Sequence, residues 1–253
     1  MRKRVFQILI TLSGIIGSGK SSLTKLLSEE LGTEAFYEPV EDNPVLPLFY
    51  KGNEIAAKRR ANGEEDTSNP YAYLLQTFFL NRRFKMIKQA MTEDNNVLDR
   101  SIYEDAIFMK MNTDMGNATQ VEYDIYKSLL DNMLEELPYA AHKKSPDLMV
   151  MIDVSYETMI KRIKKRGREF EQIENDPSLV NYYKQLLDYY ATWKTEYSAS
   201  PLLVIDGDKY DFMSNLSDRN EVLNLIEQRL VDLGKLTEDE FKEIKTKRGE
   251  ELG

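Results

Sequence analysis

A glycine-rich segment near the N-terminus has the spacing of a phosphate-binding loop. Residues 14–21 read Gly-Ile-Ile-Gly-Ser-Gly-Lys-Ser and match the pattern G-x-x-x-x-G-K-[ST] in full. Glycines at these positions let backbone N–H groups converge on phosphate oxygens, and the helix that follows adds its dipole. Lys20 would reach the β- and γ-phosphates, and Ser21 would offer an oxygen to Mg²⁺. We therefore expect a phosphate site made by Gly14, Gly17, Ser18, Gly19, Lys20, Ser21 and Ser22.

A phosphate loop alone can serve a motor, a switch, a regulator or a kinase, so other charged residues must decide between them. Glu38 follows a short apolar run and is either a cap or surface carboxylate, or a base for an acceptor hydroxyl. Asp99 follows Val97 and Leu98, and it could hold Mg²⁺ directly or through water. The adjacent Arg100 could neutralise phosphate charge.

A third charged cluster covers residues 161–168, of which six of eight are basic. Arg162 and Arg166 are four residues apart and share a helix face, while Arg168 follows Gly167, a residue type that commonly ends helices. The run is either a solvated helix face that binds anions at the surface, or a lid that folds over a transferring phosphoryl group. We favour the lid.

The elements that must position these residues follow from the hydrophobic pattern. Short apolar, β-branched runs alternate with long segments of helical spacing, which indicates an α/β fold with a parallel sheet wrapped by helices. In such sheets the carboxyl ends of the strands form the ligand crevice, so all three charged clusters can face the phosphate loop. The strands are expected at Val5–Leu12, Ala35–Tyr37, Val97–Leu98, Leu148–Val154 and Leu202–Ile205. The helices are expected at Ser21–Leu31, Tyr71–Met91, Ile102–Met111, Val121–Leu137, Tyr156–Arg166, Leu179–Tyr197 and Glu221–Leu233.

Composition narrows the chemistry and the partners. The chain of 253 residues has no cysteine and one histidine, which excludes disulfides, thiolate metal sites and cysteine nucleophiles. Its formal net charge of −9 would repel a polyanion, so nucleic acid is not an expected partner. No apolar run approaches the length of a membrane-spanning helix and no cleavage site follows the N-terminal segment, so we expect a cytoplasmic protein with no membrane partner.

Two segments differ in composition from the single domain expected over residues 1–234. Residues 51–69 are polar and contain two glycines, so they are interpreted as a surface insertion, either ordered or disordered. Residues 235–253 are highly charged and are expected to form a C-terminal helix or tail on the surface.

Taken together, these motifs resemble the P-loop deoxynucleoside kinases. The resemblance covers about residues 5–215 and rests on the loop, Glu38-Pro39, Asp99-Arg100-Ser101, and Arg162-x-x-x-Arg166-Gly-Arg168 with Glu171. It is greatest to the bacterial deoxyadenosine, deoxyguanosine and deoxycytidine kinases, through residues 43–50, 95–105 and 205–208. The resemblance implies a P-loop kinase fold, with a five-stranded parallel sheet, helices on both faces and an arginine-rich lid.

The resemblance also implies a role for each site residue. Glu38 would be the base for the 5′-hydroxyl, Arg100 would hold the base and the phosphates, and Ser21 and Asp99 would hold Mg²⁺. The sugar 3′-hydroxyl would be bound by Tyr50 and Glu171, the nucleobase edge would be read by Gln76, Arg83 and Asp105, and the lid would consist of Arg162, Arg166 and Arg168. One departure is Phe170, where many members carry a second glutamate.

The expected activity is transfer of the γ-phosphate of ATP, with Mg²⁺, to the 5′-hydroxyl of a deoxynucleoside in nucleotide salvage. Deoxyadenosine is the first expected substrate, followed by deoxyguanosine and deoxycytidine, with thymidine poorest. Family members are usually homodimers through long helices, here residues 71–91 and 121–137. Two alternatives stay open at this point, a nucleoside monophosphate kinase and a non-enzymatic nucleotide-binding regulatory module. Glu38 argues against the first, because a carboxylate at the acceptor suits a neutral hydroxyl and repels a phosphate.

Overall fold

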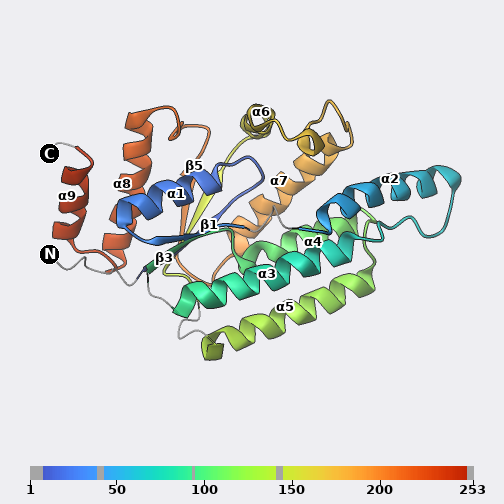
Figure 1. Cartoon of the computed structure of the whole chain (residues 1–253), viewed down its shortest axis with the longest axis horizontal. Coiled ribbons are helices and arrows are strands. Elements are labelled where there is room, and N and C mark those ends of the chain that lie inside the picture. Colours follow the sequence, from blue (N-terminus) through green and yellow to red (C-terminus); the bar gives the residue numbers. More distant parts are fainter. Residues whose placement is uncertain (1–7, 39–42, 93–94, 141–144, 250–253) are drawn as a thin grey trace.

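The computed structural model describes residues 8–38, 43–92, 95–140 and 145–249, and it contains a five-stranded parallel sheet (Figure 1). The strand order is β2-β3-β1-β4-β5, and every neighbouring pair is parallel. The predicted α/β fold is therefore confirmed. The strands are β1 (Ile8–Ser13), β2 (Glu34–Phe36), β3 (Asn95–Asp99), β4 (Leu148–Asp153) and β5 (Leu202–Asp206).

Helices lie on both sides of the sheet (Figure 1). Helix α1 packs on β1, β2 and β3, while α3 packs on β3 and joins a group with α4 and α5. Helix α7 packs against α4, and α8 lies beside β5. The helices are α1 (Lys20–Leu31), α2 (Leu46–Asn62), α3 (Ala72–Thr92), α4 (Asp105–Asp114), α5 (Gln120–Ala140), α6 (Tyr156–Arg166), α7 (Leu179–Glu196), α8 (Leu216–Asp232) and α9 (Glu238–Lys247), with short 3₁₀ turns η1 (Ile102–Glu104) and η2 (Glu169–Glu171).

The central strands are buried on both faces, which explains their nearly continuous apolar sequences. All six residues of β1 are buried, and so are five of the six residues of β4. Strands covered on both faces carry apolar side chains at successive positions rather than at alternate ones. This burial stabilises the sheet, and the sheet in turn sets the positions of the polar residues at its carboxyl edge.

The register brings the expected site residues to one edge of the sheet. Leu12 of β1 is opposite Asp99 of β3, and the Arg100 amide donates to the Leu12 carbonyl at 2.9 Å. Phe36 of β2 pairs with Leu98, so Glu38 follows two residues beyond the edge. The ends of β2, β3 and β1 therefore place Glu38, Asp99 and the glycine-rich loop side by side.

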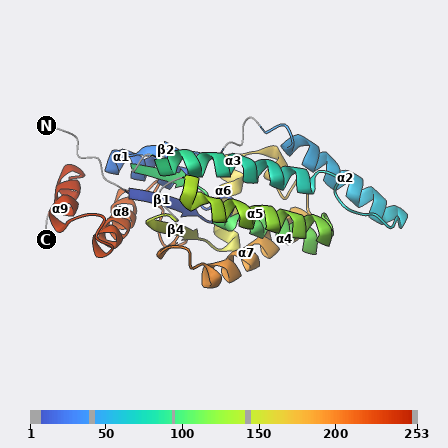
Figure 2. The ribbon, with the colours of Figure 1, turned by 90° about the horizontal axis from the view of Figure 1, so that it is seen from below.

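Residues 51–69 are ordered, so the alternative of a disordered insertion is wrong. Helix α2 continues to Asn62 and projects from the body of the molecule beside α3 (Figures 1 and 2). Asn69 is buried, and its side-chain amide donates to the Phe49 carbonyl at 2.9 Å and to Asn53 Oδ1 at 2.7 Å. A Cβ atom on Gly52 would come within 2.0 Å of Asn69 Oδ1, so this glycine permits a close contact inside a helix. Most of the segment is nevertheless exposed, as the surface interpretation requires.

The charged C-terminal segment contains the amphipathic helix α9, which packs on α8. A capping box formed by Thr237 and Glu240 begins it. Phe241 and Ile244 are buried, and Arg248 donates to both carboxylate oxygens of the buried Glu227 on α8. The helix is thus attached to the domain by apolar and ionic contacts. No helix in the described ranges is long and apolar enough to cross a lipid bilayer.

Candidate active site

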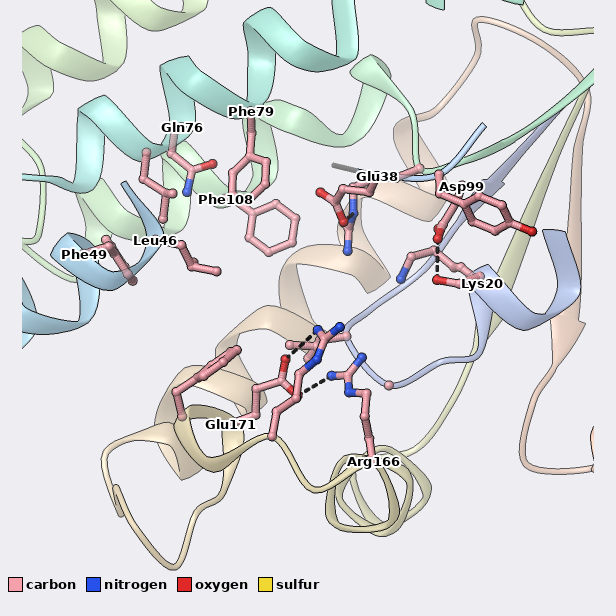
Figure 3. A pocket seen from close by; sticks show the side chains of 18 of the residues that line it. Lys20, Glu38, Leu46, Phe49, Gln76, Phe79, Asp99, Phe108, Arg166 and Glu171 are labelled. Atoms are coloured by element: carbon pink, nitrogen blue, oxygen red, sulfur yellow. Dashed lines mark hydrogen bonds and ion pairs between the residues drawn. The ribbon is translucent and has the colours of Figure 1, made fainter. Parts of the chain in front are cut away.

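A cavity of about 580 Å³ opens at the carboxyl edge of the sheet, between the phosphate loop, α2, α3 and the turn after α6 (Figure 3). Figure 3 shows Lys20, Glu38 and Asp99 near one end of the cavity and Phe49 and Gln76 near the other. The residues that line it are Ile16, Gly17, Lys20, Ser21, Tyr37, Glu38, Leu46, Phe49, Tyr50, Leu75, Gln76, Phe79, Arg83, Asp99, Arg100, Phe108, Arg166, Arg168, Phe170, Glu171 and Tyr182.

The glycine-rich loop has the backbone that its sequence requires. Gly14, Gly17 and Gly19 all have positive φ values, of 140°, 76° and 104°, which side chains disfavour. The Lys20 ammonium spans the loop and donates to the carbonyls of Gly14 at 2.8 Å and Ile15 at 2.9 Å. Burial, reinforced by the charge of Arg100, lowers the pKa of Lys20 to about 8. The loop thus ends in a buried ammonium at the N-terminus of α1, as the predicted phosphate site requires. Gly14, Ser18, Gly19 and Ser22 belong to this loop and the first turn of α1 but do not line the cavity.

Ser21 and Asp99 are in direct contact, since the serine hydroxyl donates to Asp99 Oδ2. Asp99 Oδ1 is buried and has no hydrogen-bond partner among the described residues. Burial raises the pKa of Asp99, although Lys20 and Ser21 oppose the shift. A hydroxyl and an unpaired carboxylate oxygen beside a phosphate loop fit Mg²⁺, which takes one or two protein oxygens and completes its shell with phosphates and water. Among the described residues, no group of three or more His, Cys, Asp or Glu side chains could form a complete protein cage for a metal.

Glu38 lies between two arginines. Its Oε1 accepts from Arg83, and its Oε2 accepts from Arg100 Nε at 3.1 Å. Burial alone would raise the pKa of Glu38, but the charges of Arg100 and Arg83 hold it at about 2. The carboxylate is therefore fully ionised at neutral pH, and it is aimed at the same cavity as Lys20.

Of the three residues predicted to read the nucleobase, Gln76 lies near one end of the cavity (Figure 3), whereas Arg83 forms ion pairs with Asp105 and with Glu38. Gln76 and Arg83 line the cavity, and the Arg83 guanidinium lies over the Phe79 ring at 4.9 Å. Asp105 is fully buried behind Arg83, which donates to it, and does not line the cavity. Arg83 Nε and Asp105 Oδ2 have no hydrogen-bond partner within the described part of the chain. Arg83 therefore links Asp105 to Glu38.

The predicted lid divides into two parts. Arg166 and Arg168 line the cavity and form ion pairs with Glu171, which is 3% exposed. Arg162 instead donates to the carbonyls of Ser18 at 2.6 Å and Gly207 at 2.7 Å, and it does not line the cavity. The structure thus places Arg166 and Arg168 beside Glu171 at the cavity and Arg162 against the phosphate loop.

Tyr50, predicted to bind the sugar, does lie in the cavity despite the long segment that separates it from Gln76. The centre of its ring is 5.0 Å from that of Phe170 in η2, so α2 and η2 are in contact at the cavity wall. Sequence reasoning missed the apolar walls, made by Leu46, Phe49, Leu75, Phe79 and Phe108. It also gave no site role to Tyr182 of α7, which lines the cavity. Only the helical spacing of these residues was available as a signal, and it does not separate a cavity wall from a core.

Comparisons with known proteins agree with this geometry. The chain matches the family described as deoxynucleoside kinase over residues 10–232. It is 56% identical over 230 residues to the deoxyguanosine kinase of Lactobacillus johnsonii, covering 91% of this chain and 96% of that protein. It is 52% identical over 227 residues to the deoxyadenosine kinase of Lactobacillus acidophilus, covering 90% of this chain and 98% of the relative.

A solved structure supports the same relationship. The deoxyadenosine kinase from M. mycoides with bound dCTP superposes with a TM-score of 0.65 at 29% sequence identity, covering 87% of this chain and all of that chain. The family match spans most of the sequence, and the fold and the phosphate loop are those expected of it. The chain therefore belongs to the deoxynucleoside kinase family.

Proposed function

We propose that the protein transfers the γ-phosphoryl group of ATP to the 5′-hydroxyl of a deoxynucleoside, and that it does so in the cytoplasm. The observation that carries this proposal is the position of Glu38, an ionised carboxylate in the same cavity as the phosphate-loop ammonium of Lys20. A hydroxyl held by Glu38 would face a phosphoryl group held by the loop, which is the arrangement that phosphoryl transfer needs.

Each charged residue has a part in this reaction. Lys20 would stabilise the charge that develops on the transferring group, and Glu38 would orient the hydroxyl and accept its proton. Arg100 lies within hydrogen-bond distance of Glu38 and would stabilise the phosphates. Mg²⁺ held by Ser21 and Asp99 would neutralise the β- and γ-phosphates.

The charge balance of the cavity favours a neutral acceptor over a nucleoside monophosphate. A second phosphate would need free cationic groups, yet Arg83 is paired with Glu38 and Asp105. Arg166 and Arg168 are likewise paired with Glu171. These carboxylates would repel an acceptor phosphate and can accept hydrogen bonds from sugar hydroxyls.

For the base, we propose deoxyadenosine first, deoxyguanosine and deoxycytidine next, and thymidine last. The Gln76 amide offers N–H donors and a carbonyl acceptor, while Arg83 offers only hydrogen-bond donors and Asp105 only acceptors. Thymine places an oxo group where adenine and cytosine carry an amino group, and it adds a methyl group. The names of relatives from Lactobacillus, deoxyguanosine kinase and deoxyadenosine kinase, agree with a purine preference.

The base readers can be tested by removing both charges together. Arg83→Met with Asp105→Ala avoids leaving one buried charge without its partner. We expect the ratio of kcat/KM for thymidine to that for deoxyadenosine to rise at least about tenfold, because the site no longer rejects the unmatched edge. The ratio is the measurement, since the loss of Arg83 also removes a partner of Glu38 and lowers overall turnover. Arg82→Met, at the adjacent exposed position, is the control; an unchanged ratio in the double variant would show that Arg83 and Asp105 do not read the base.

One experiment tests the proposed function as a whole. The protein is incubated with MgATP and each of the four deoxynucleosides, and monophosphate formation is measured. A parallel reaction with dAMP as acceptor tests the monophosphate kinase alternative. Formation of dAMP from deoxyadenosine without conversion of dAMP to dADP supports the proposal. Nucleotide binding without transfer to any acceptor would instead indicate a regulatory module.

We further propose a homodimer through α3 and α5, which pack side by side. Three apolar side chains near the N-terminal ends of these helices are exposed, Leu74, Val121 and Ile125, at 48%, 66% and 53%. Exposed apolar side chains on two neighbouring helices are a feature of subunit interfaces. We expect the wild type to elute as a dimer and the double variant Val121→Asp with Ile125→Asp as a monomer, measured by light scattering. Leu225→Asp, at an exposed position of α8, is the control; a monomeric wild type would contradict the proposal.

A further inference from the structure

Glu104 is a buried carboxylate that the proposed reaction does not use. It ends η1, is 0% exposed and does not line the cavity. Its Oε2 accepts from the Ser13 hydroxyl at 2.7 Å and the Tyr190 hydroxyl at 2.8 Å, and its Oε1 accepts from the Ser101 amide at 3.2 Å. These donors come from three separate segments, which are the end of β1, the turn after β3, and α7. Glu104 therefore joins three of the segments that surround Arg100.

Arg100 depends on this network for its position. Its Nη1 donates to the Tyr190 hydroxyl at 2.8 Å and lies 3.7 Å from Glu104 Oε1, while its Nε donates to Glu38. Burial raises the pKa of Tyr190 well above its ordinary value, so the hydroxyl keeps the single proton that it donates to Glu104. The lone pairs of the hydroxyl are then left for Arg100, which fixes the direction of both hydrogen bonds.

The backbone at Arg100 also needs support. Its φ of 76° is the only positive value at a non-glycine residue in the described ranges. Such a conformation is costly and persists only where neighbouring contacts hold it. Two contacts do so here, the Arg100 amide on the Leu12 carbonyl and the Ser101 amide on Glu104. The carboxylate thus supports both the backbone of this turn and the guanidinium that projects from it.

We propose that Glu104, acting through Tyr190, is a positioning residue. It holds the Arg100 guanidinium against Glu38 and fixes its position relative to Ser13, the residue before the phosphate loop. The proposal rests on the proposed function, because it assigns Glu104 to the alignment of the acceptor carboxylate with the donor phosphates. Two features distinguish the Glu104–Arg100 pair from an ordinary ion pair in a protein core. The groups that Glu104 orders belong to segments that carry site residues, and the cation in its ion pair, Arg100, lines the cavity.

Glu104→Gln tests the proposal with almost no change in side-chain volume. An amide nitrogen in place of either carboxylate oxygen would face a hydrogen-bond donor. The negative charge beside Arg100 would also be lost. We expect kcat with deoxyadenosine and MgATP to fall about tenfold to a hundredfold, as is common when a group that orients a site residue is replaced. KM for both substrates should change less than about threefold, because a misplaced Arg100 weakens the transition state more than substrate binding.

Glu227→Gln is a matched control, because Glu227 of α8 is also 0% exposed and is paired with an arginine, Arg248, at the end of α9. A core carboxylate of this kind should alter the melting temperature and leave kcat within about twofold of the wild type. If Glu104 has a structural role only, its amide variant will behave in the same way, and the proposal is then wrong. Circular dichroism and melting curves, taken with ATP present, establish that both variants are folded.

Tyr190→Phe decides the question even if the Glu104 variant does not fold. It removes one hydroxyl and keeps the ring, which is 6.2 Å from Trp193 in the α7 packing. We expect kcat to fall at least about threefold with unchanged KM values, and an unchanged kcat would overturn the proposal. A wild type that transfers no phosphate to any deoxynucleoside would refute the proposed function instead, so the two failures are distinguishable.

Discussion

Lys20→Ala is expected to abolish phosphoryl transfer while the protein stays folded. The ammonium is buried at the end of the phosphate loop, where low local polarity strengthens its interaction with phosphate charge. Removing a group that stabilises transition-state charge costs about 10²–10³ in kcat in other enzymes, and a loop lysine that reaches two phosphates should reach at least that loss. The measurement is kcat with saturating deoxyadenosine and MgATP. Near-normal turnover would refute the assignment of the loop.

The control for this variant is Lys25→Ala, because Lys25 lies on the same helix and is exposed beside Glu29. We expect its activity to match the wild type. A pH profile gives a second readout of Lys20, whose pKa is about 8. The ammonium is present below this pH and is lost above it, so kcat/KM for ATP should decline as the pH rises through about 8. The decline should be absent from the residual activity of Lys20→Ala.

The sheet could be predicted from the sequence because parallel strands buried on both faces leave long apolar runs. β1, β4 and β5 match their expected positions to within a few residues in the described part, although residues 5–7 lie outside the described residues. The polar segment at 51–69 was harder to interpret, because Gly52 and the charged residues around it are typical of a loop. Its order comes from a contact between Gly52 and Asn69, seventeen residues apart, which no local pattern indicates.

Site residues could be predicted where a local sequence pattern placed them, and could not be predicted where contacts between distant residues did. Asp99 ends β3, Arg100 follows it, and Glu38 lies two residues beyond β2, so the topology of a parallel sheet was enough to bring them together. Glu104 received no role, because its partners Ser13 and Tyr190 lie 91 and 86 residues away in the sequence. Tyr190 has the helical spacing of a core residue and is indeed buried, yet its hydroxyl serves Arg100. Arg162 was expected in the lid, but its guanidinium points to the carbonyls of Ser18 and Gly207, which belong to loops far away in the sequence.

Glu38→Gln is expected to lower kcat by about 10²–10⁴, the range for loss of a general base, with a much smaller change in deoxynucleoside binding. The amide keeps the size of the side chain, but it cannot accept a proton, and its nitrogen would face the N–H donor of Arg83 or Arg100. It also leaves Arg83 and Arg100 facing a neutral group. The matched control is Glu34→Gln, an exposed position on β2, which should leave turnover unchanged.

The pH dependence distinguishes a base from a positioning group. Since the charges of Arg100 and Arg83 hold the pKa of Glu38 at about 2, the carboxylate is ionised at every pH at which the enzyme can be assayed. Wild-type kcat/KM should therefore show no acid limb from Glu38 above pH ~4, and the Gln variant should be slow at all pH values rather than only at low pH. Such a weakly basic carboxylate suits a loose transition state, in which the hydroxyl proton is transferred late. If turnover of Glu38→Gln falls less than about tenfold, Glu38 only orients the hydroxyl, and the proton must leave through another group or water.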